Sequence, residues 1–223
     1  MVNREAWQSL TAELAQHDVT LVAVSKTKPV SDIQSLYDLG QRDFGENYVQ
    51  ELVEKQAQLP GDIRWHFIGH LQSNKVKYIA PFVHLIHGVD NFRLLQEINK
   101  QASRHGRRID VLLQQYIAAE ETKFGMDEKE LTAFTEQYTA QQDLHANVRI
   151  CGLMGMASFT DDEAQLREEF GRLAANFRKL KETYFRDAPH FSILSAGMTS
   201  DYRLAVAAGS TMVRVGSLLF GSR

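Results

Sequence analysis

The sequence contains one cysteine, Cys151, which excludes an internal disulfide framework and fits a reducing compartment. It also lacks any run approaching the ~18 consecutive apolar residues that indicate a membrane-spanning helix. The opening residues 1–7 are largely polar and contain no apolar core of a secretory signal. From these absences we expect a soluble cytoplasmic protein that does not engage a membrane.

Positive charge is not in excess, because 25 lysines and arginines stand against 28 aspartates and glutamates, a formal net charge of −3. This balance gives no general attraction to nucleic acid. The sequence has no linker rich in proline, glycine and serine, no repeat and no low-complexity tract. A length of 223 residues fits one large α/β domain, so we expect a single domain over residues 1–223.

Short β-rich runs alternate with helical segments along the whole chain. The run at residues 20–25 is almost continuously apolar, as in a strand buried on both faces of a parallel sheet. Strands are predicted at residues 20–25, 43–45, 65–68, 83–86, 109–113, 148–153, 191–194 and 212–215. Helices are predicted at residues 4–16, 31–39, 48–58, 74–79, 91–104, 127–141, 161–184 and 201–208. Capping chemistry is expected at Ser31, Asn91 and Asp127, and a capping box at residues 160–163.

This count predicts a single (β/α)8 TIM-type barrel with an extra N-terminal helix. The eighth helix of the standard barrel is missing, and we expect the opening helix to cover that face. The competing architecture is an open doubly wound sheet, but no Gly-x-Gly-x-x-Gly turn follows the first strand.

Lys26 directly follows the first buried strand, where barrel active sites are built. Partial desolvation favours a neutral lysine amine, the form that condenses with an aldehyde to a Schiff base. The simpler interpretation is a solvated lysine at a strand end. Lys28 lies two residues further on and would point to the same face as Lys26. It adjoins Pro29, where the chain leaves the barrel, so it is the weaker candidate.

The residues after the last two strands predict a phosphate site, since barrels often bind phosphate there with help from a helix N-terminus. Glycines allow close backbone approach, and hydroxyls and backbone N–H groups can point at an anion. The alternative is an ordinary helix cap followed by a tight turn. The residues concerned are Gly197, Thr199, Ser200, Asp201, Gly216 and Ser217.

Arg214 is a charged residue inside the apolar run at residues 212–215. A buried guanidinium needs acceptors, because leaving it unpaired costs on the order of 3–5 kcal/mol. A phosphate, a pyridine nitrogen or a structural carboxylate could serve. An arginine facing a pyridine nitrogen would keep the ring unprotonated and weaken it as an electron sink.

The histidines do not form a convincing metal motif. His66 and His70 have the spacing of a helical zinc motif but straddle a strand and a loop. His84 and His87 also lie in a strand-like run, and we therefore expect no metal site. Cys151 is expected to pack in the core rather than act as a nucleophile.

Several longer motifs occur together and in order. They are Val22-Ala-Val-Ser-Lys-Thr-Lys-Pro29, Phe44-Gly-Glu-Asn-Tyr48, His66-Phe-Ile-Gly-His-Leu-Gln-Ser-Asn-Lys75, Gly152-Leu-Met154, and Gly209-Ser-Thr-Met-Val-Arg-Val-Gly216 with Phe220-Gly221. From about residue 21 to the C-terminus the sequence resembles the YggS/PROSC family of pyridoxal 5′-phosphate (PLP) homeostasis proteins.

This resemblance implies the fold of the N-terminal barrel of alanine racemase and PLP held as a Schiff base on Lys26. By motif position it places Asn47 near the cofactor and Arg214 near the ring nitrogen or the phosphate. It implies that the phosphate is held by Thr199, Ser200, Gly216 and Ser217.

The sequence departs from the family pattern at three places. After the seventh strand the usual Ser-Met-Gly-Met-Ser reads Ser195-Ala-Gly-Met-Thr199, which keeps the hydroxyl while Ala196 is expected to loosen nearby packing. After the fifth strand, Gln115-Tyr116 replaces an asparagine-containing stretch, so a family contact at Tyr116 is in doubt. The N-terminal segment is also shorter.

Racemases on this barrel need a second base opposite the lysine, from another domain or subunit, and the chain leaves no room for that domain. A barrel mouth open to water suits binding and releasing a cofactor better than directing its chemistry. We therefore expect a monomeric PLP carrier or regulator without strong catalytic activity, with PLP-dependent apoenzymes as candidate partners. The alternatives are a weak racemase-like PLP enzyme acting on small amino acids and a cofactor-free Schiff-base aldolase using Lys26.

Overall fold

A computed structural model describes residues 2–119 and 124–221. The predicted domain, 1–223, also takes in residues 1, 120–123 and 222–223, which lie outside the described residues. None of the described helices is both long enough and apolar enough to span a bilayer.

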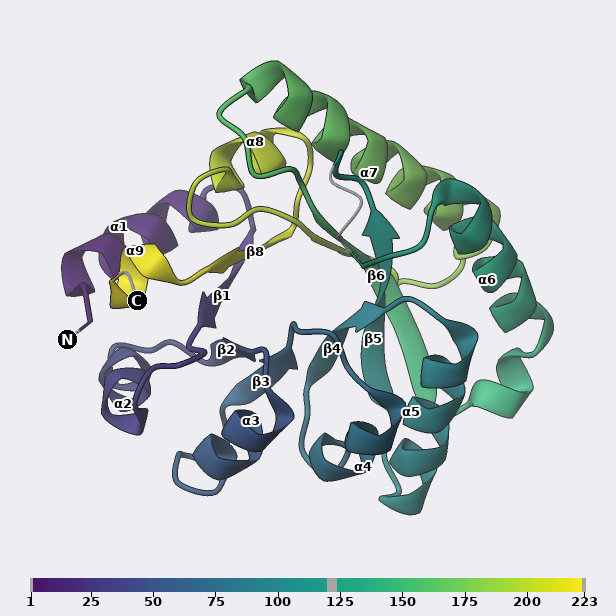
Figure 1. Cartoon of the computed structure of the whole chain (residues 1–223), viewed down its shortest axis with the longest axis horizontal. Coiled ribbons are helices and arrows are strands. Elements are labelled where there is room, and N and C mark those ends of the chain that lie inside the picture. The colour runs from purple at the N-terminus through teal and green to yellow at the C-terminus, as the bar shows by residue number, and fades with distance from the viewer. Residues whose placement is uncertain (1, 120–123, 222–223) are drawn as a thin grey trace.

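The strands close into one parallel barrel in chain order, with β1 paired to both β2 and β8 (Figure 1). The predicted barrel is therefore confirmed, and the open doubly wound sheet is wrong. The strands are β1 Thr20–Val24, β2 Asp43–Glu46, β3 Arg64–Phe67, β4 Leu85–Val89, β5 Ile109–Tyr116, β6 Val148–Met156, β7 Ile193–Ser195 and β8 Met212–Val215.

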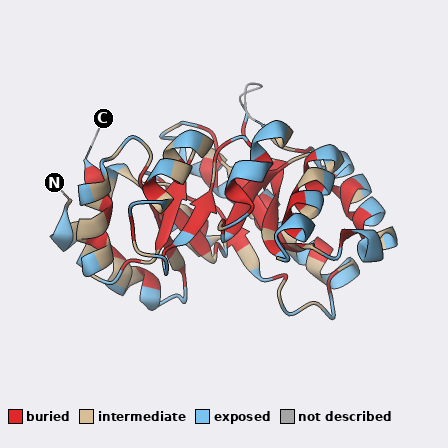
Figure 2. Ribbon diagram, turned by 90° about the horizontal axis from the view of Figure 1, so that it is seen from below, coloured by how far each residue is buried: buried red, intermediate tan, exposed pale blue. Residues whose placement is uncertain are grey.

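The helices surround the barrel with their apolar faces turned inward (Figure 2). They are α1 Arg4–Ala15, α2 Val30–Asp38, α3 Val49–Gln56, α4 Val76–Ile79, α5 Phe92–Arg104, α6 Glu128–Ala140, α7 Glu163–Thr183, α8 Tyr202–Ala207 and α9 Ser217–Phe220. Two short 3-10 helices, η1 Ser73–Lys75 and η2 Gln142–His145, precede α4 and β6.

The extra N-terminal helix lies against the first and last parts of the barrel. Helix α1 packs beside α9 and β1 (Figure 1), and the backbone N–H of Asn3 donates to the carbonyl of Leu219 at 2.8 Å. The opening helix thus covers the face expected of it. It shares that face with α9, a four-residue helix that the sequence pattern did not predict.

Capping follows the prediction at two helices and departs from it at two others. Asn91 caps α5, and Asp127 forms a capping box with Glu130 at the start of α6. Helix α2 instead begins after Pro29, which leaves Ser31 inside the helix. The expected box at residues 160–163 is also wrong, because Asp162 is the cap of α7 and accepts from the first-turn N–H groups directly.

The predicted strand ends are inaccurate where polar residues or a glycine continue a strand. β5 extends to Tyr116 and β6 to Met156, beyond the apolar runs that marked them. β4 begins at Leu85 rather than at residue 83, so His84 lies before the strand. The longer β5 and β6 pair along their whole length and extend toward the carboxyl-end mouth.

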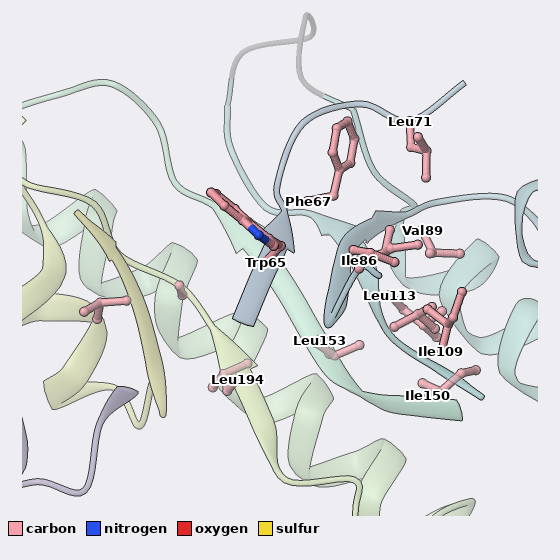
Figure 3. Close-up of a cluster of buried hydrophobic side chains, with 14 of the residues drawn as sticks. Trp65, Phe67, Leu71, Ile86, Val89, Ile109, Leu113, Ile150, Leu153 and Leu194 are labelled. Atoms are coloured by element: carbon pink, nitrogen blue, oxygen red, sulfur yellow. The ribbon is translucent and has the colours of Figure 1, made fainter. Parts of the chain in front are cut away.

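Apolar side chains form two clusters because successive strand residues point to opposite faces. The larger cluster fills the space between barrel and helices, with Trp65 and Phe67 of β3 among its members (Figure 3). The smaller cluster fills the barrel and consists of Val22, Leu85, Leu112, Cys151, Met154 and Met212. Cys151 is thus packed inside the barrel, and burial raises the pKa of its thiol to about 12. The interior also holds buried polar side chains.

Candidate functional site

A cavity of about 440 Å³ opens at the carboxyl ends of the strands. The seven residues that the family resemblance places at the cofactor all line it, namely Lys26, Asn47, Thr199, Ser200, Arg214, Gly216 and Ser217. Gly197 and Asp201, which were also expected at the phosphate site, are not among its described lining residues. Val24, Thr27, Lys28, Ile68, Met156, Phe159, Met198 and Gly221 complete the lining. Residues from both ends of the chain therefore meet in one place because parallel strands end on the same side of the barrel.

Lys26 lies in a turn whose backbone is held under strain. β1 ends at Val24, Ser25 is buried, and Thr27 adopts a left-handed conformation with φ of 65°. A β-branched residue rarely adopts this conformation. The Thr27 N–H donates to the Glu51 carboxylate of α3, which ties the strained turn to the neighbouring helix. The position of Lys26 thus depends on residues outside the cavity.

A buried ion cluster lies directly beneath this turn. Lys55 of α3 donates to the Ser25 carbonyl at 2.7 Å, to Glu46 at 2.7 Å and to Glu51 at 2.6 Å. The Ser25 hydroxyl donates to Glu46 at 2.6 Å. Burial raises the pKa of Glu46 even though Lys55 and Ser25 both favour its ionised form. Sequence analysis missed Lys55, because its helical neighbourhood looks like an ordinary exposed face.

The loops after β7 and β8 are joined to each other across the cavity wall. The Ser217 hydroxyl donates to the Thr199 hydroxyl oxygen at 3.1 Å. The Asp201 carboxylate accepts from the Met198 N–H at 2.6 Å and closes the turn in which Thr199 and Ser200 lie. Gly197 has φ of 96°, and a Cβ there would lie 2.8 Å from Tyr202 Cα, so only glycine fits without displacement. This arrangement gathers hydroxyl groups at one end of the cavity.

Asn47 follows β2, lines the cavity and has one buried polar atom that lacks a partner. Its Oδ1 is buried and has no hydrogen-bond partner among the described residues. Buried polar atoms are almost always paired, and an unpaired one costs about 1–3 kcal/mol. An acceptor left in this state in a cavity wall suits a ligand that donates a hydrogen bond.

Arg214 is 4% exposed and lies on the inward face of β8. It donates to the Ser195 hydroxyl at 2.7 Å and to the Gly155 carbonyl at 3.0 Å, both of them neutral acceptors. Burial lowers the pKa of Arg214 to about 10, and the charge of Asp201 only partly opposes this effect. The guanidinium is therefore held from below by neutral groups, beside a cavity that can admit an anion.

Lys28 also lines the cavity but is engaged elsewhere. Its ammonium group donates to the carbonyls of Phe220 and Gly221, each at 3.2 Å, and so ties the first loop to the end of α9. Ala196 is 2% exposed and lies in the main apolar cluster. Tyr116 is not among the described residues that line the cavity.

The histidines group differently from their sequence spacing. His66 is buried in the barrel, whereas the side chain of His70 is 41% exposed on a loop. At the opposite mouth of the barrel, Asp43, His66 and His84 bring ligand atoms within 4.8 Å of one another. Both oxygens of Asp43 already accept hydrogen bonds from Arg64, and Oδ1 accepts another from His66. We assign no metal to this cluster.

Comparison with known proteins identifies the family of this chain. The family model for the alanine racemase N-terminal domain matches residues 4–223. A pyridoxal phosphate homeostasis protein of Pasteurella multocida is 40% identical over 95% of this chain and 90% of its own length. One from Escherichia coli K12 is 40% identical over 92% of this chain and 86% of its own length. The chain belongs to the pyridoxal phosphate homeostasis protein family.

Solved structures from the same family have the same fold. PipY of Synechococcus elongatus PCC7942 is 36% identical, and the match covers 97% of this chain and 99% of PipY. The TM-score is 0.89 for PipY without PLP and 0.86 for PipY with PLP bound. Alanine racemase of Streptomyces lavendulae, at 14% identity and a TM-score of 0.77, shows only the shared barrel, with 98% of this chain matching 57% of the racemase.

Proposed function

We propose that this protein binds PLP in the cavity, carries it as a Schiff base on Lys26 and takes part in intracellular PLP homeostasis. The observation that carries the proposal is the meeting of Lys26, Arg214 and the hydroxyl cluster in one cavity. The relatives of this chain are named for PLP homeostasis, and PipY has been solved with PLP bound. Schiff-base formation joins Nζ of the neutral lysine amine to the aldehyde carbon and releases one water.

Each part of the cavity suits one part of the cofactor. The hydroxyls of Thr199, Ser200 and Ser217, with the backbone at Gly216, would hold the phosphate. Arg214 would face the pyridine nitrogen, since Ser195 and Gly155 fix it on the inner barrel wall. The buried Oδ1 of Asn47 would accept a hydrogen bond from the ligand. When bound, PLP supplies the aldehyde and an electron-withdrawing ring, which an arginine partner leaves unprotonated.

The composition of the cavity wall favours a carrier over a racemase-like enzyme. Among its described lining residues none carries a carboxylate, phenol, thiol or imidazole. Besides Lys26 the ionisable groups there are Lys28, which donates to two backbone carbonyls, and Arg214. A racemase needs a second base to move the Cα proton from one face to the other. The proposal includes a monomer acting in the cytoplasm, with PLP-dependent apoenzymes as recipients.

The test is to add PLP to the purified protein, record the visible Schiff-base band, reduce with borohydride and map the labelled peptide. We expect the label on Lys26 in the wild type and in Lys28→Ala, and its loss in Lys26→Ala with the fold retained. A label spread over surface lysines, or a Lys26→Ala protein that keeps a reducible adduct, would refute the assignment. Exchange of the Cα proton of alanine in deuterated water, sustained over many turnovers, would instead favour the racemase-like enzyme.

A further inference from the structure

A continuous row of hydrogen-bonded side chains crosses the barrel interior beneath the cavity. Arg214 Nη1 lies 2.7 Å from Ser195 Oγ, and Ser195 Oγ lies 3.1 Å from His87 Nδ1. His87 Nε2 lies 2.9 Å from His66 Nδ1, and His66 Nε2 lies 2.9 Å from Asp43 Oδ1. The row begins at the wall of the cavity and ends at the opposite mouth of the barrel. All of its members are less than 9% exposed.

With both imidazoles neutral, the chemistry of the two ends sets the direction of every bond in this row. Arginine can only donate, so the Ser195 oxygen accepts from Arg214. At the far end two hydrogen bonds from Arg64 keep Asp43 ionised, so Asp43 accepts from His66 Nε2. With neutral imidazoles, His66 Nδ1 then accepts from His87 Nε2, and His87 Nδ1 accepts from the Ser195 hydroxyl. Every donor has an acceptor, and all donors point away from the cavity.

Burial and neighbouring charge support the neutral state of His87. It is fully buried, and desolvation lowers the pKa of His87 well below its usual value, with further lowering from the Arg214 charge. A neutral imidazole has one donor and one acceptor, which is what its position between Ser195 and His66 requires. The groups facing His66 are Asp43, His87 and the ring of His84 at 5.4 Å.

We propose that Ser195, His87, His66 and Asp43 form a relay that positions the Arg214 guanidinium at the PLP ring. This inference rests on the proposed PLP function. The carboxylate of Asp43 polarises both imidazoles and the Ser195 hydroxyl in turn, and hydrogen bonds in such a row strengthen one another. The relay therefore holds a buried cation beside the cofactor through neutral hydrogen-bonding groups. The members act through Arg214 and are positioning residues.

The relay and simple core packing lead to two different expectations. A packing role would require only the volume of His87, whereas the relay requires its Nε2–H tautomer. A packing role would also leave Arg214 unaffected by Asp43, which lies at the other end of the barrel. The matched control is His84, which lies at the same mouth and contacts the ring of His66 but takes no part in the row.

The first experiment assigns the imidazole tautomers by long-range ¹H–¹⁵N NMR of the wild-type protein without PLP. We expect both His66 and His87 as Nε2–H tautomers. An Nδ1–H tautomer at His87 would overturn the direction of the relay, whatever the protein does with PLP.

The second experiment measures PLP affinity and the pH midpoint of the Schiff-base band in variants. Ser195→Ala and His87→Phe are each expected to weaken PLP binding about tenfold. The first removes the charge-assisted hydrogen bond to Arg214, and the second removes the acceptor that orients the Ser195 hydroxyl. The double variant should be no weaker than either single variant, because all act through one row. When the Arg214 guanidinium is held less firmly near the ring, the pH midpoint of the Schiff-base band should rise, since a nearby positive charge disfavours a protonated imine.

The controls keep the two proposals distinguishable. His84→Phe should leave affinity and midpoint unchanged, and His87→Gln, whose amide both donates and accepts, should restore most of the affinity. If His87→Phe fails to fold, Ser195→Ala and His87→Gln decide the matter. Wild-type protein that forms no Schiff base would refute the proposed function. Wild-type binding with unchanged affinity and midpoint in Ser195→Ala would refute only the relay.

Discussion

Lys55 and Glu46 form an ion pair that water barely reaches, with 2.7 Å between Nζ and Oε1 and side chains that are 6% and 0% exposed. The same ammonium group donates to the carbonyl of Ser25, the residue before Lys26. A structural ion pair of α3 and β2 thereby fixes the turn that presents the proposed Schiff-base lysine.

Lys55→Met should destabilise the protein by about 3–5 kcal/mol, because it leaves the Glu46 carboxylate buried without its partner. Lys179→Met is the control, since Lys179 and Glu128 form an exposed pair at 2.9 Å that contributes at most about 1 kcal/mol. Urea unfolding measures both. Equal losses in the two variants would show that the buried pair contributes no more than a surface one.

Thr27→Gly should stabilise the protein without ligand by about 0.5–1 kcal/mol, because glycine adopts the left-handed backbone of this turn without strain. PLP affinity should fall, since the turn that holds Lys26 loosens. Asp18→Gly is the matched control, as Asp18 has φ of 54° but lies away from the cavity. It should gain less stability and leave PLP affinity unchanged in a fluorescence titration.

Asn47→Leu should raise the stability of the ligand-free protein by about 1 kcal/mol, because it removes a buried oxygen without a partner. The same change should weaken PLP binding. Asn99→Leu should lower the stability, since Asn99 Oδ1 accepts from the Asn147 N–H and its Nδ2 donates to the Leu144 carbonyl. Thermal unfolding with and without PLP separates the two effects, and a destabilised Asn47→Leu would contradict the prediction.

Gly197→Ala should destabilise the protein by about 1–3 kcal/mol and weaken phosphate binding, because the new methyl group meets Tyr202 and Ala205. Gly209→Ala shares the positive φ, at 108°, but a Cβ there meets nothing within 4 Å. Gly209→Ala should therefore lose only the stability that a positive φ costs an alanine, without the loss that a steric clash would add. The measurement is thermal unfolding in increasing inorganic phosphate. If phosphate raised the Tm of Gly197→Ala as much as it raises that of the wild type, phosphate would bind elsewhere.

His87 should make the protein less stable as the pH falls below about 6.5. Burial lowers its pKa in the folded state below the ordinary value of 6.5, so only the unfolded chain takes up the proton. The stability due to the neutral ring is complete above that value and falls by up to ~1.4 kcal/mol per pH unit below it. His87→Gln should flatten this part of the curve between about pH 5 and 6.5. Parallel curves for variant and wild type would show that His87 is protonated in the fold.

Local sequence determined the elements of the fold and most of the site. Apolar runs separated by helical segments specify eight strands whose ends must share one side of the barrel. That rule alone brings Lys26, Arg214 and Ser217 together, although they stand at opposite ends of the chain. Sequence reasoning failed where strands continued through polar residues, as at Gln115 in β5, because hydropathy does not mark them.

Only the tertiary structure decided what supports the site. Lys55 looked like a surface residue until α3 packed over the ends of β1 and β2. His66 and His87 were considered for their spacing to nearby histidines, yet His66 pairs with Asp43 on the preceding strand and His87 with Ser195 on the distant β7. A buried polar side chain must find a partner, but the closure of the barrel determines which one lies within reach. The residues of the proposed ligand site are therefore readable from the sequence, and those that hold them in place are not.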